Sequence, residues 1–597
     1  MNSDKLKSII ITEKLLMEGR TYRIGYKELT NDGLYALNRQ KDGTIKKYKV
    51  CDTIYVEETV ENLDTGEHYL MIVNKGKRGY VKRKFPMDIL IPQKLIGLLR
   101  YGIDIPPEFD KTISTYLLEQ RKFMPHKLVY NNIGWNRDES GDLEFRLNER
   151  ISNNSSSIAL NDKDNLKFNL SNMGSLQRWL EMYHNEIKGH IPLEAIICIS
   201  FSAVIVGYLN KMNKDVDTII IHLAGKSTTG KTTASKAALA VFGLPDTKNK
   251  GLLRTWNATT NAMINSLGGN FGVPIAFDEL SMVNQNTITK ELYTIASGLE
   301  KARLSDSITQ RDQQTWATTI ISTGEQSLFE KTNNNAGLRV RAISFEGIGW
   351  TKSAENAENI KSVINENYGY PAVEFVKYIF ENGFEIIDSK FESWRNRALE
   401  VMPESEFKDR IANKFATILT AGDIANEALG LEIDLEGVLN FLSENEAENI
   451  KERDFAEKAF NDMLQVIIQN ISRFKTSNGY STPSNCWGRI ENDAGYYQVM
   501  MLQNVLKNKL RELNNEDPKI VIKEWKSKGY LISEVDRSTI CRRVFTKDEQ
   551  KERKESLGKT KVSKDNLADT VYILKVPRQY LQKYLTVNTS PTPLHKV

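Results

Sequence analysis

The sequence predicts an α/β fold with a parallel sheet at its centre, and three observations support this prediction. Strand-like and helix-like segments alternate between about residues 216 and 350, which is typical of such sheets. Residues 216–223 form a short, continuous apolar run, as expected for a strand buried on both faces. A glycine-rich segment, 225–232, joins this run to an Ala-rich helix expected over 232–242. We therefore expect a ligand site at the carboxyl end of this strand.

The rest of the chain predicts further regions on both sides of this core. Alternating apolar and polar residues over 22–85 predict a mostly β region with a hairpin turn at 64–66, followed by a helical stretch and more strands up to residue 145. Near the other end, 520–531 joins a helix to a glycine turn and a strand, which resembles a winged helix. We expect an N-terminal α/β domain (1–150), a linker with a helical lead-in (151–210), the α/β core (211–350), a helical lid and extension (351–475) and a basic winged-helix-like domain (476–597).

Composition indicates a folded, cytoplasmic protein. At 597 residues the chain is too long for one hydrophobic core, and its 40% hydrophobic and 26% charged residues are ordinary for a globular protein. The longest apolar stretch, 195–209, is too short for a membrane span and predicts a buried core helix. Residues 1–16 lack the features of a secretory signal. No CxxC pair occurs, so we expect neither a zinc site nor a disulfide framework from Cys51, Cys198, Cys486 and Cys541.

The charge is unevenly distributed. The chain has a net charge of +4, but residues 501–597 alone carry 21 Lys and Arg against 12 Asp and Glu, a net +9. Lysine and arginine neutralise phosphates, so a basic terminal domain points weakly to nucleic acid. Solvated surface charge explains it equally well.

The segment from Gly225 to Thr232 fits the phosphate-binding pattern GxxxxGK[ST]. The glycines allow successive backbone N–H groups to face phosphates, and the following helix adds positive partial charge. We expect Lys231 to reach the β- and γ-phosphates of ATP and Thr232 to bind Mg²⁺. The residues expected to contact the nucleotide are Gly225, Lys226, Ser227, Thr228, Thr229, Gly230, Lys231, Thr232 and Thr233.

Acidic and hydroxyl residues follow two later strands. The apolar run 273–277 ends in Asp278 and Glu279, which we expect to hold Mg²⁺ and to orient the attacking water. A further buried strand ends in Ser322 and Thr323, and Thr323, or less favourably Ser322, is expected to sense the γ-phosphate.

Two arginines alternate with apolar residues at the entry to another strand. Either Arg339 or Arg341 can serve as an arginine finger, which stabilises charge on the phosphate of a neighbouring subunit. The alternative is a pair of surface arginines engaged in ion pairs.

As a set, these motifs resemble a bacterial uncharacterised-domain family of AAA+ ATPases. The segments that carry the resemblance are 225–232, 255–262, 277–279, 298–303, 322–325 and 337–341. Within that family the sequence is similar to the cassette chromosome helicases of staphylococcal mobile resistance elements, which are themselves similar to MCM replicative helicases. The resemblance extends over about residues 50–350 and continues more weakly through 368–372 and 410–422.

The resemblance implies an AAA+ core in a hexameric homo-oligomeric ring that moves along single-stranded or forked DNA, with possible element-encoded replication partners and no membrane. It also implies a hairpin in the central channel, where Lys301, Arg303 and Arg311 would contact phosphates. A plain solvated hairpin is the alternative for these three residues, and a structural ion pair is a further alternative for Arg303. Arg410 occupies the place of a second nucleotide-sensing arginine, although a helix-face arginine in an ion pair would look the same.

We therefore expect an ATP-dependent DNA helicase that replicates a mobile element. A non-translocating ATPase switch, such as an origin-binding initiator, would use the same motifs. A P-loop kinase is disfavoured, because adjacent Asp278 and Glu279 and the downstream arginines suit water activation and subunit coupling better than phosphate transfer to a small acceptor.

The basic run 75–84 can contact DNA or form an ordinary charged hairpin face. No chemical role can be assigned to the segment from Trp256 to Asn261.

Overall fold

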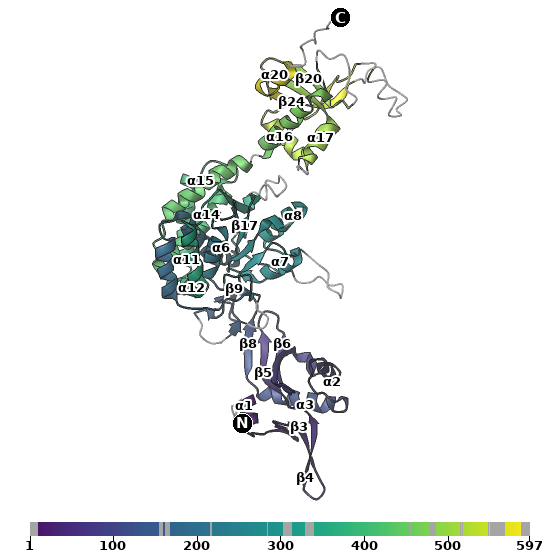
Figure 1. Cartoon of the computed structure of the whole chain (residues 1–597), viewed down its shortest axis with the longest axis vertical. Helices are drawn as coiled ribbons and strands as arrows, with labels where there is room; N and C mark the ends of the chain where they lie inside the picture. Colours follow the sequence, from purple (N-terminus) through teal and green to yellow (C-terminus); the bar gives the residue numbers. More distant parts are fainter. Residues whose placement is uncertain are drawn as a thin grey trace, which may run out of the picture.

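The structure, a computed structural model, places three units in a row along the long axis of the chain (Figure 1). The N-terminal strands lie at one end, the helix-rich α/β unit lies in the middle, and a smaller C-terminal unit lies at the other end. The structure describes the whole chain except residues 1–9, 154–158, 162–166, 215, 217, 283–284, 302–312, 329–339, 454, 477–484, 514, 516, 547–548, 550–567 and 587–597.

The N-terminal unit consists of two sheets and three short α-helices around its own core. One antiparallel sheet has the order β1-β2-β3-β4, formed by Tyr22–Ile24, Lys27–Thr30, Gly33–Arg39 and Ile45–Cys51. The other has the order β12-β8-β5-β6-β7, formed by Ala159–Asn161, His126–Tyr130, Ile54–Asn62, His68–Gly76 and Gly79–Pro86. The helices are α1 (Glu13–Met17), α2 (Pro92–Leu95) and α3 (Asp110–Gln120). The expected hairpin is confirmed as β5 and β6, and its turn includes Asp64.

The central unit is built on a parallel five-stranded sheet, as predicted. Its order is β14-β16-β17-β13-β18, formed by Leu253–Thr255, Ile275–Asp278, Thr319–Gly324, Ile219–Ala224 and Ala342–Glu346. Strand β13 is buried along its whole length, which explains its unbroken apolar sequence. The outer edge of β18 is covered by helix α15 (Leu435–Arg453), where Asn445 and Asn449 donate hydrogen bonds to the carbonyl of Ser344 at 2.9 and 3.1 Å. These amides satisfy a backbone acceptor that an edge strand would otherwise expose.

Helices surround this sheet. They are α4 (Leu176–Met182), α5 (Ile191–Lys211), α6 (Lys231–Ala240), α7 (Thr260–Leu267), α8 (Gln285–Ser297), α11 (Ala354–Ile364), α12 (Tyr370–Asn382), α13 (Glu385–Val401), α14 (Lys408–Leu429) and α15 (Leu435–Arg453). Within the described residues, α5 is the one helix long and apolar enough to cross a membrane, and 89% of its most apolar window is buried inside the unit. It packs against α14 and α6, so the expectation of a core helix over 195–209 is confirmed.

Residues 133–150 lie in the central unit, although the sequence predicted them as part of the N-terminal domain. Strands β9 (Ile133–Arg137), β10 (Leu143–Arg146) and β11 (Arg150–Ile151) form a sheet with β15 (Asn270–Phe271) of the core. Trp135 is fully buried there and donates a hydrogen bond to the carbonyl of Val204 on α5 at 2.8 Å. The sequence pattern shows strands here but not the partner against which they pack.

Three backbone segments meet closely at this sheet. A Cβ atom at Gly134 of β9 would lie 2.1 Å from the carbonyl oxygen of Phe271, and one at Gly207 of α5 would lie 2.3 Å from the same oxygen. Gly134 also has a positive φ of 77°. Glycine is thus needed at both positions because of the close approach.

An ionic cluster joins the β5–β6 turn to this sheet. Asp64 accepts hydrogen bonds from the backbone N–H groups of Asn131 and Asn132 at 2.6 and 2.7 Å and pairs with Arg146 at 2.6 Å. Arg146 also pairs with Glu144 at 2.5 Å, and all three charged side chains are less than 10% exposed. Because buried charges need such partners, the cluster fixes how the N-terminal unit joins the centre.

The C-terminal unit has a six-stranded sheet covered by helices. Its helices are α16 (Phe455–Gln469), α17 (Gln503–Glu512), α18 (Pro518–Ser527) and α20 (Arg578–Thr586), and its strands are β19 (Phe474–Thr476), β20 (Gly488–Asn492), β21 (Tyr496–Leu502), β22 (Leu531–Ile532), β23 (Ile540–Arg542) and β24 (Asp569–Pro577). The sheet order is β19-β20-β21-β24-β22, and β23 also pairs with β24. Trp525 of α18 is fully buried and bonds to the carbonyl of Ala456 on α16 at 2.7 Å.

Candidate functional site

The glycine-rich segment forms a tight loop between β13 and α6. Strand β13 ends at Ala224, and α6 begins at Lys231. Thr228 and Gly230 have positive φ angles of 77° and 84°, so the loop curls as a phosphate-binding loop must. At Gly230 a Cβ atom would lie 2.5 Å from the hydroxyl of Thr351, which leaves no room for a side chain there.

Lys231 lies inside the curve of this loop. Its ammonium group donates hydrogen bonds to the carbonyls of Gly225 and Lys226, both at 2.7 Å. Burial lowers the pKa of Lys231, and the nearby carboxylates of Glu325, Glu279 and Asp278 oppose that shift. The positive charge therefore faces the same space as the loop N–H groups and the start of α6.

The acidic residues and Thr323 meet at the ends of two neighbouring strands. Asp278 ends β16, and the hydroxyl of Thr323 on β17 donates a hydrogen bond to its carboxylate. The same hydroxyl accepts a hydrogen bond from the backbone N–H of Glu279 at 3.2 Å. Glu279 has a φ of 67°, a left-handed conformation that is uncommon for a residue other than glycine. Thr323 thus holds both acidic residues in place.

Ser322 does not face this space. It is fully buried and contacts the imidazole of His222 at 2.9 Å and the indole N–H of Trp256 at 3.0 Å. Trp256 is itself 1% exposed, packs on Phe277, and donates its backbone N–H to the carbonyl of Asp278 at 3.0 Å. The structure therefore gives Trp256 a role that the sequence did not reveal: it ties the ends of β16 and β17 together behind the acidic residues.

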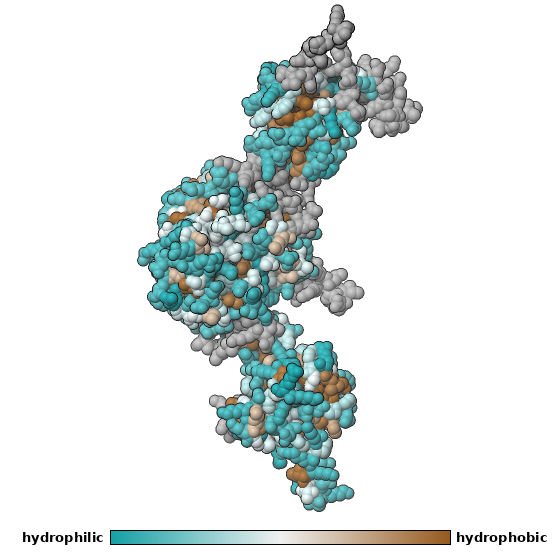
Figure 2. Space-filling model, viewed as in Figure 1, coloured by the Kyte–Doolittle hydropathy of each residue, from teal (hydrophilic) through white to brown (hydrophobic). Residues whose placement is uncertain are grey.

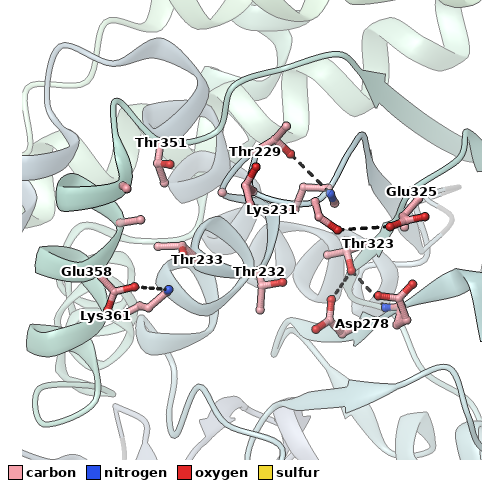
Figure 3. Close-up of a pocket in the computed structure, with 17 residues that line it drawn as sticks. Thr229, Lys231, Thr232, Thr233, Asp278, Thr323, Glu325, Thr351, Glu358 and Lys361 are labelled. Atoms are coloured by element: carbon pink, nitrogen blue, oxygen red, sulfur yellow. Dashed lines mark hydrogen bonds and ion pairs between the residues drawn. The ribbon is translucent and has the colours of Figure 1, made fainter.

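The loop, Lys231, the two acidic residues and Thr323 line a single pocket of about 390 Å³, which we call the P-loop pocket. Figure 3 shows Asp278, Thr323 and Glu325 on one side of Lys231 and Thr232, and Glu358 and Lys361 of α11 on the other. Glu325 accepts a hydrogen bond from Ser227 of the loop at 3.3 Å. The lining residues are Ser227, Thr228, Thr229, Gly230, Lys231, Thr232, Thr233, Asp278, Glu279, Thr323, Gly324, Glu325, Thr351, Ala354, Ala357, Glu358 and Lys361. The expected residues Gly225 and Lys226 are beside it, where their carbonyls bind Lys231.

The far wall of the pocket was not expected from the sequence. The segment after β18 reaches the loop through a hydrogen bond from the N–H of Trp350 to the carbonyl of Thr229 at 2.8 Å. It leads into α11, where small side chains at Ala354 and Ala357 face the pocket and Glu358 pairs with Lys361 at 2.8 Å. Residues of these types are common on any helix, so no sequence signal distinguishes them.

Arg341 and Arg410 lie together in a second pocket, which we call the basic pocket. It has a volume of about 230 Å³ and is lined by Val216, Val340, Arg341, Arg410, Asn413, Lys414 and Thr417. Lys414 of α14 donates a hydrogen bond to the carbonyl of Arg341 at 2.7 Å, and the Arg341 guanidinium lies over the ring of Tyr293. Among the residues that the structure describes, the basic pocket and the P-loop pocket have no lining residue in common. Arg339 lies outside the described residues.

The basic pocket lies at the opposite edge of the sheet from the loop. Strands β13 and β18 are parallel, and Ala342, which follows Arg341, pairs with Ile220 near the start of β13. Ala224 lies four residue steps along the strand from Ile220, about 13 Å at the usual rise per residue. Arg341 and Arg410 therefore do not line the P-loop pocket of their own chain.

The expected DNA-contacting hairpin is described only at its base. Leu299 and Thr315 form an antiparallel bridge, and the N–H of Glu300 bonds to the carbonyl of Gln314 at 2.8 Å. Lys301 is exposed just beyond this base. Arg303 and Arg311 lie outside the described residues.

Comparisons with known proteins agree with these features. Residues 27–315 match the model of a domain of unknown function, DUF927, and residues 454–579 match a Cch helix-turn-helix domain. Among solved structures, the chain is similar to "SCCmec type IV Cch - active helicase", with 26% sequence identity and a TM-score of 0.72, over 94% of this chain and 99% of the other. The chain belongs to the Cch-like family. A search of curated proteins finds no significant match.

In this Cch-like chain, the helix-turn-helix domain corresponds to the C-terminal unit. Helix α18 follows α17 and exposes Lys519, Ile520 and Lys523 on its outer face. Lys526, on the same helix, donates hydrogen bonds to the carbonyls of Glu534 and Val535 at 2.7 and 2.6 Å. This holds the segment between β22 and β23 against α18, so helix and loop present one surface.

Proposed function

We propose that this Cch-like chain is an ATP-dependent DNA helicase with a P-loop AAA+ core and a C-terminal winged helix. The observation that carries the proposal is the P-loop pocket, where a curled loop, Lys231 and two carboxylates meet at the carboxyl ends of parallel strands. Similarity to a protein described as an active helicase, over 94% of the chain, supports the choice of helicase among P-loop ATPases. We further propose that it acts in the cytoplasm, on single-stranded or forked DNA, in replicating a mobile element.

Each residue of the pocket has a separable task in this proposal. The loop N–H groups and Lys231 bind the phosphates of ATP, because both place positive charge in the same space. Thr232 and Asp278 both line the pocket and offer oxygen ligands, which Mg²⁺ prefers. Mg²⁺ bound with ATP would neutralise negative charge on the phosphates. Glu279 would orient the attacking water, and Thr323 holds Glu279 and Asp278 in register.

The basic pocket supports a ring in which each active site is shared between subunits. Arg341 and Arg410 are too far from their own loop to contact its phosphates, and together they gather positive charge in one cavity. Such a cavity suits the phosphates of ATP bound to a neighbouring copy. We propose a hexamer, with Arg341 as finger, Arg410 as second sensor, and Lys414 positioning Arg341 through its carbonyl. The alternative arginine finger is Arg339. The proposed contacts with DNA phosphates in the central channel are Lys301, Arg303 and Arg311.

Strand separation on a forked DNA with ATP tests the proposal. We expect the wild type to separate the strands and Lys231→Ala to lose both ATP binding and unwinding. Glu279→Gln should bind ATP with near wild-type affinity but turn it over at least 100-fold more slowly, because the phosphate cradle is intact while water is no longer oriented. Equal ATP affinity of wild type and Lys231→Ala would refute the site assignment.

A non-translocating, origin-binding ATPase switch is the second candidate function. The helix-turn-helix match and the exposed face of α18 favour it, since such a domain reads duplex DNA and needs no translocation. This candidate predicts ATP-dependent assembly on duplex DNA without strand separation under any salt or polarity of fork. Unwinding by the wild type would exclude it.

A further inference from the structure

The hairpin formed by β3 and β4 projects from the free end of the N-terminal unit (Figure 1). Every residue from Asn38 to Lys49 is exposed. The turn is nevertheless ordered: the N–H of Gln40 bonds to the carbonyl of Thr44 at 2.8 Å, and Asp42 accepts a hydrogen bond from the N–H of Thr44 at 2.9 Å. A preformed projection loses little conformational freedom when it binds a partner.

This projection concentrates positive charge. Residues 38–49 contain five cations and one acid, so these twelve residues carry a net charge of +4, as much as the entire chain. Lys47 pairs with Glu28 and Lys49 pairs with Asp52 at the base. Among the described residues, Arg39, Lys41 and Lys46 nearer the tip have no ion-pair partner within 4 Å.

Large apolar side chains are exposed beside these cations. Ile45 is 57% exposed and Tyr48 is 46% exposed, both on β4, and the Tyr48 ring also contacts Phe109 with ring centroids 6.2 Å apart. Tyr26 is 78% exposed and lies in the turn between β1 and β2. Its backbone carbonyl accepts a hydrogen bond from the N–H of Leu37 on β3 at 2.8 Å. Figure 2 shows the projection as a mainly hydrophilic surface with a small hydrophobic spot. Cations interleaved with exposed aromatic rings are the chemistry that binds single-stranded nucleic acid, through phosphates and stacked bases.

The other basic hairpin of this unit, formed by β6 and β7, differs in that most of its cations contact other residues of the unit. In the run 75–84, Lys82 pairs with Glu57 and Glu58, Lys84 lies over the ring of Tyr69, and Arg83 bonds to Asn74. Lys75 donates to the carbonyl and side chain of Asn31. These four cations are engaged within the unit, as the alternative of an ordinary charged hairpin face expects, whereas Lys77 and Arg78 at the turn of this hairpin are exposed.

We propose that the β3–β4 hairpin is a binding site for single-stranded DNA, separate from the P-loop pocket and from the helix-turn-helix domain. Arg39, Lys41 and Lys46 contact successive phosphates, and Tyr48 stacks on a base. Lysines on an edge strand also oppose strand pairing between molecules, but that role predicts no effect on DNA affinity.

The test measures binding of the full-length chain to a labelled thymidine oligonucleotide and to a duplex of equal length, by fluorescence anisotropy without ATP. The triple variant Arg39→Ala, Lys41→Ala, Lys46→Ala should lower the slope of log affinity against log salt on the single strand by about 2, since each phosphate contact contributes about 0.7. Tyr48→Ala should weaken single-strand binding about tenfold and leave duplex binding unchanged, whereas Tyr48→Phe should restore it.

A charge-matched control removes three exposed cations elsewhere on the same unit, Arg100, Lys111 and Lys122. Equal weakening by both triple variants would show a net-charge effect and overturn the inference, as would an unchanged slope in the hairpin variant. Loss of duplex binding alone would also overturn it, because the site would then read duplex DNA. Since ATP is absent, failure here is distinct from failure of the proposed ATPase.

Discussion

Single side chains at the strand ends hold the P-loop pocket in shape. Thr323 bonds to Asp278 and to the N–H of Glu279, while Trp256 bonds to Ser322 behind them. Two of these contacts cross between β16 and β17, so loss of one side chain shifts both acidic residues relative to the loop. Reactions that depend on a water placed within a fraction of an ångström are sensitive to such shifts.

Replacement of Trp256 by Phe tests this coupling. The change keeps an aromatic ring but removes the N–H that Ser322 accepts, and a buried hydroxyl then loses a partner, which costs about 1–2 kcal/mol of unfolding free energy. We expect a lower melting temperature and ATP turnover reduced about tenfold, with ATP affinity nearly unchanged. Trp394→Phe is the control, because it removes an indole bond to Asp423 between α13 and α14. It should lower stability without slowing turnover; equal slowing by both variants would refute the role of Trp256.

For single residues, the sequence was informative where a motif requires a particular residue type at a particular spacing. Lys231 and the glycines of the loop have the spacing that a backbone curled around phosphates requires, so the pattern was visible in the sequence. Of the two residues considered as phosphate sensors, Thr323 lines the pocket and Ser322 is buried behind it, because alternate strand residues face opposite sides. Trp256 was recognisable but not interpretable, since its partner lies 66 residues away.

Among the elements, α11 gives the pocket its second half. The loop and the acidic residues occupy one side of the pocket, and α11 occupies the other (Figure 3). In the proposed function, a triphosphate between Lys231 and Asp278 would place the nucleoside on the side away from the acidic residues. Ala354 and Ala357 line the pocket on that side, and their small side chains would leave room for ribose and base.

Substitutions on α11 should therefore separate recognition of nucleoside from recognition of phosphate. We expect Ala357→Leu to weaken ATP binding about tenfold by filling this space, and Glu358→Ala to weaken it about threefold by removing a carboxylate that accepts hydroxyl or amino hydrogens. Binding of inorganic tripolyphosphate, measured by calorimetry, should not change. Glu374→Ala is the matched control, because Glu374 and Lys377 form the same spacing of ion pair on α12, at 2.9 Å. Parallel loss of ATP and tripolyphosphate would mean that the pocket has collapsed and would contradict the assignment.

Sequence patterns located elements better than they located contacts. The strand, loop and helix around Lys231 appear where they were expected, and so does the β5–β6 hairpin. The end of the N-terminal domain was misplaced because strands 133–151 look like their neighbours in sequence but pack on α5 and β15. Nothing local records which of two cores a strand will join.

At the scale of the whole molecule, the two pockets carry complementary groups. Among the residues that the structure describes, the P-loop pocket is lined by no arginine and the basic pocket by no residue of the 225–232 loop. In a ring, the basic pocket of one copy would complete the P-loop pocket of the next.

Mixing of two inactive variants tests this arrangement. Arg341→Ala and Lys231→Ala should each have little ATPase activity alone, and their mixture should recover a fraction of wild-type activity. Some interfaces would then pair an intact loop with an intact arginine. Recovery should peak near equal amounts, as followed by phosphate release. Absence of recovery at every ratio, with co-assembly shown by crosslinking, would contradict Arg341 as a finger acting between subunits.

The close approach at Gly134 and Gly207 has a consequence for tracing the ancestry of this fold. Both glycines press on the carbonyl of Phe271, so a methyl group at either position would force β9, α5 and β15 apart. Catalytic motifs can decay when a descendant loses its activity, but this contact is set by the packing of β9, α5 and β15 and does not depend on activity. We therefore expect distant, catalytically inactive descendants to keep glycine at both positions, even where the lysine of the loop has been replaced.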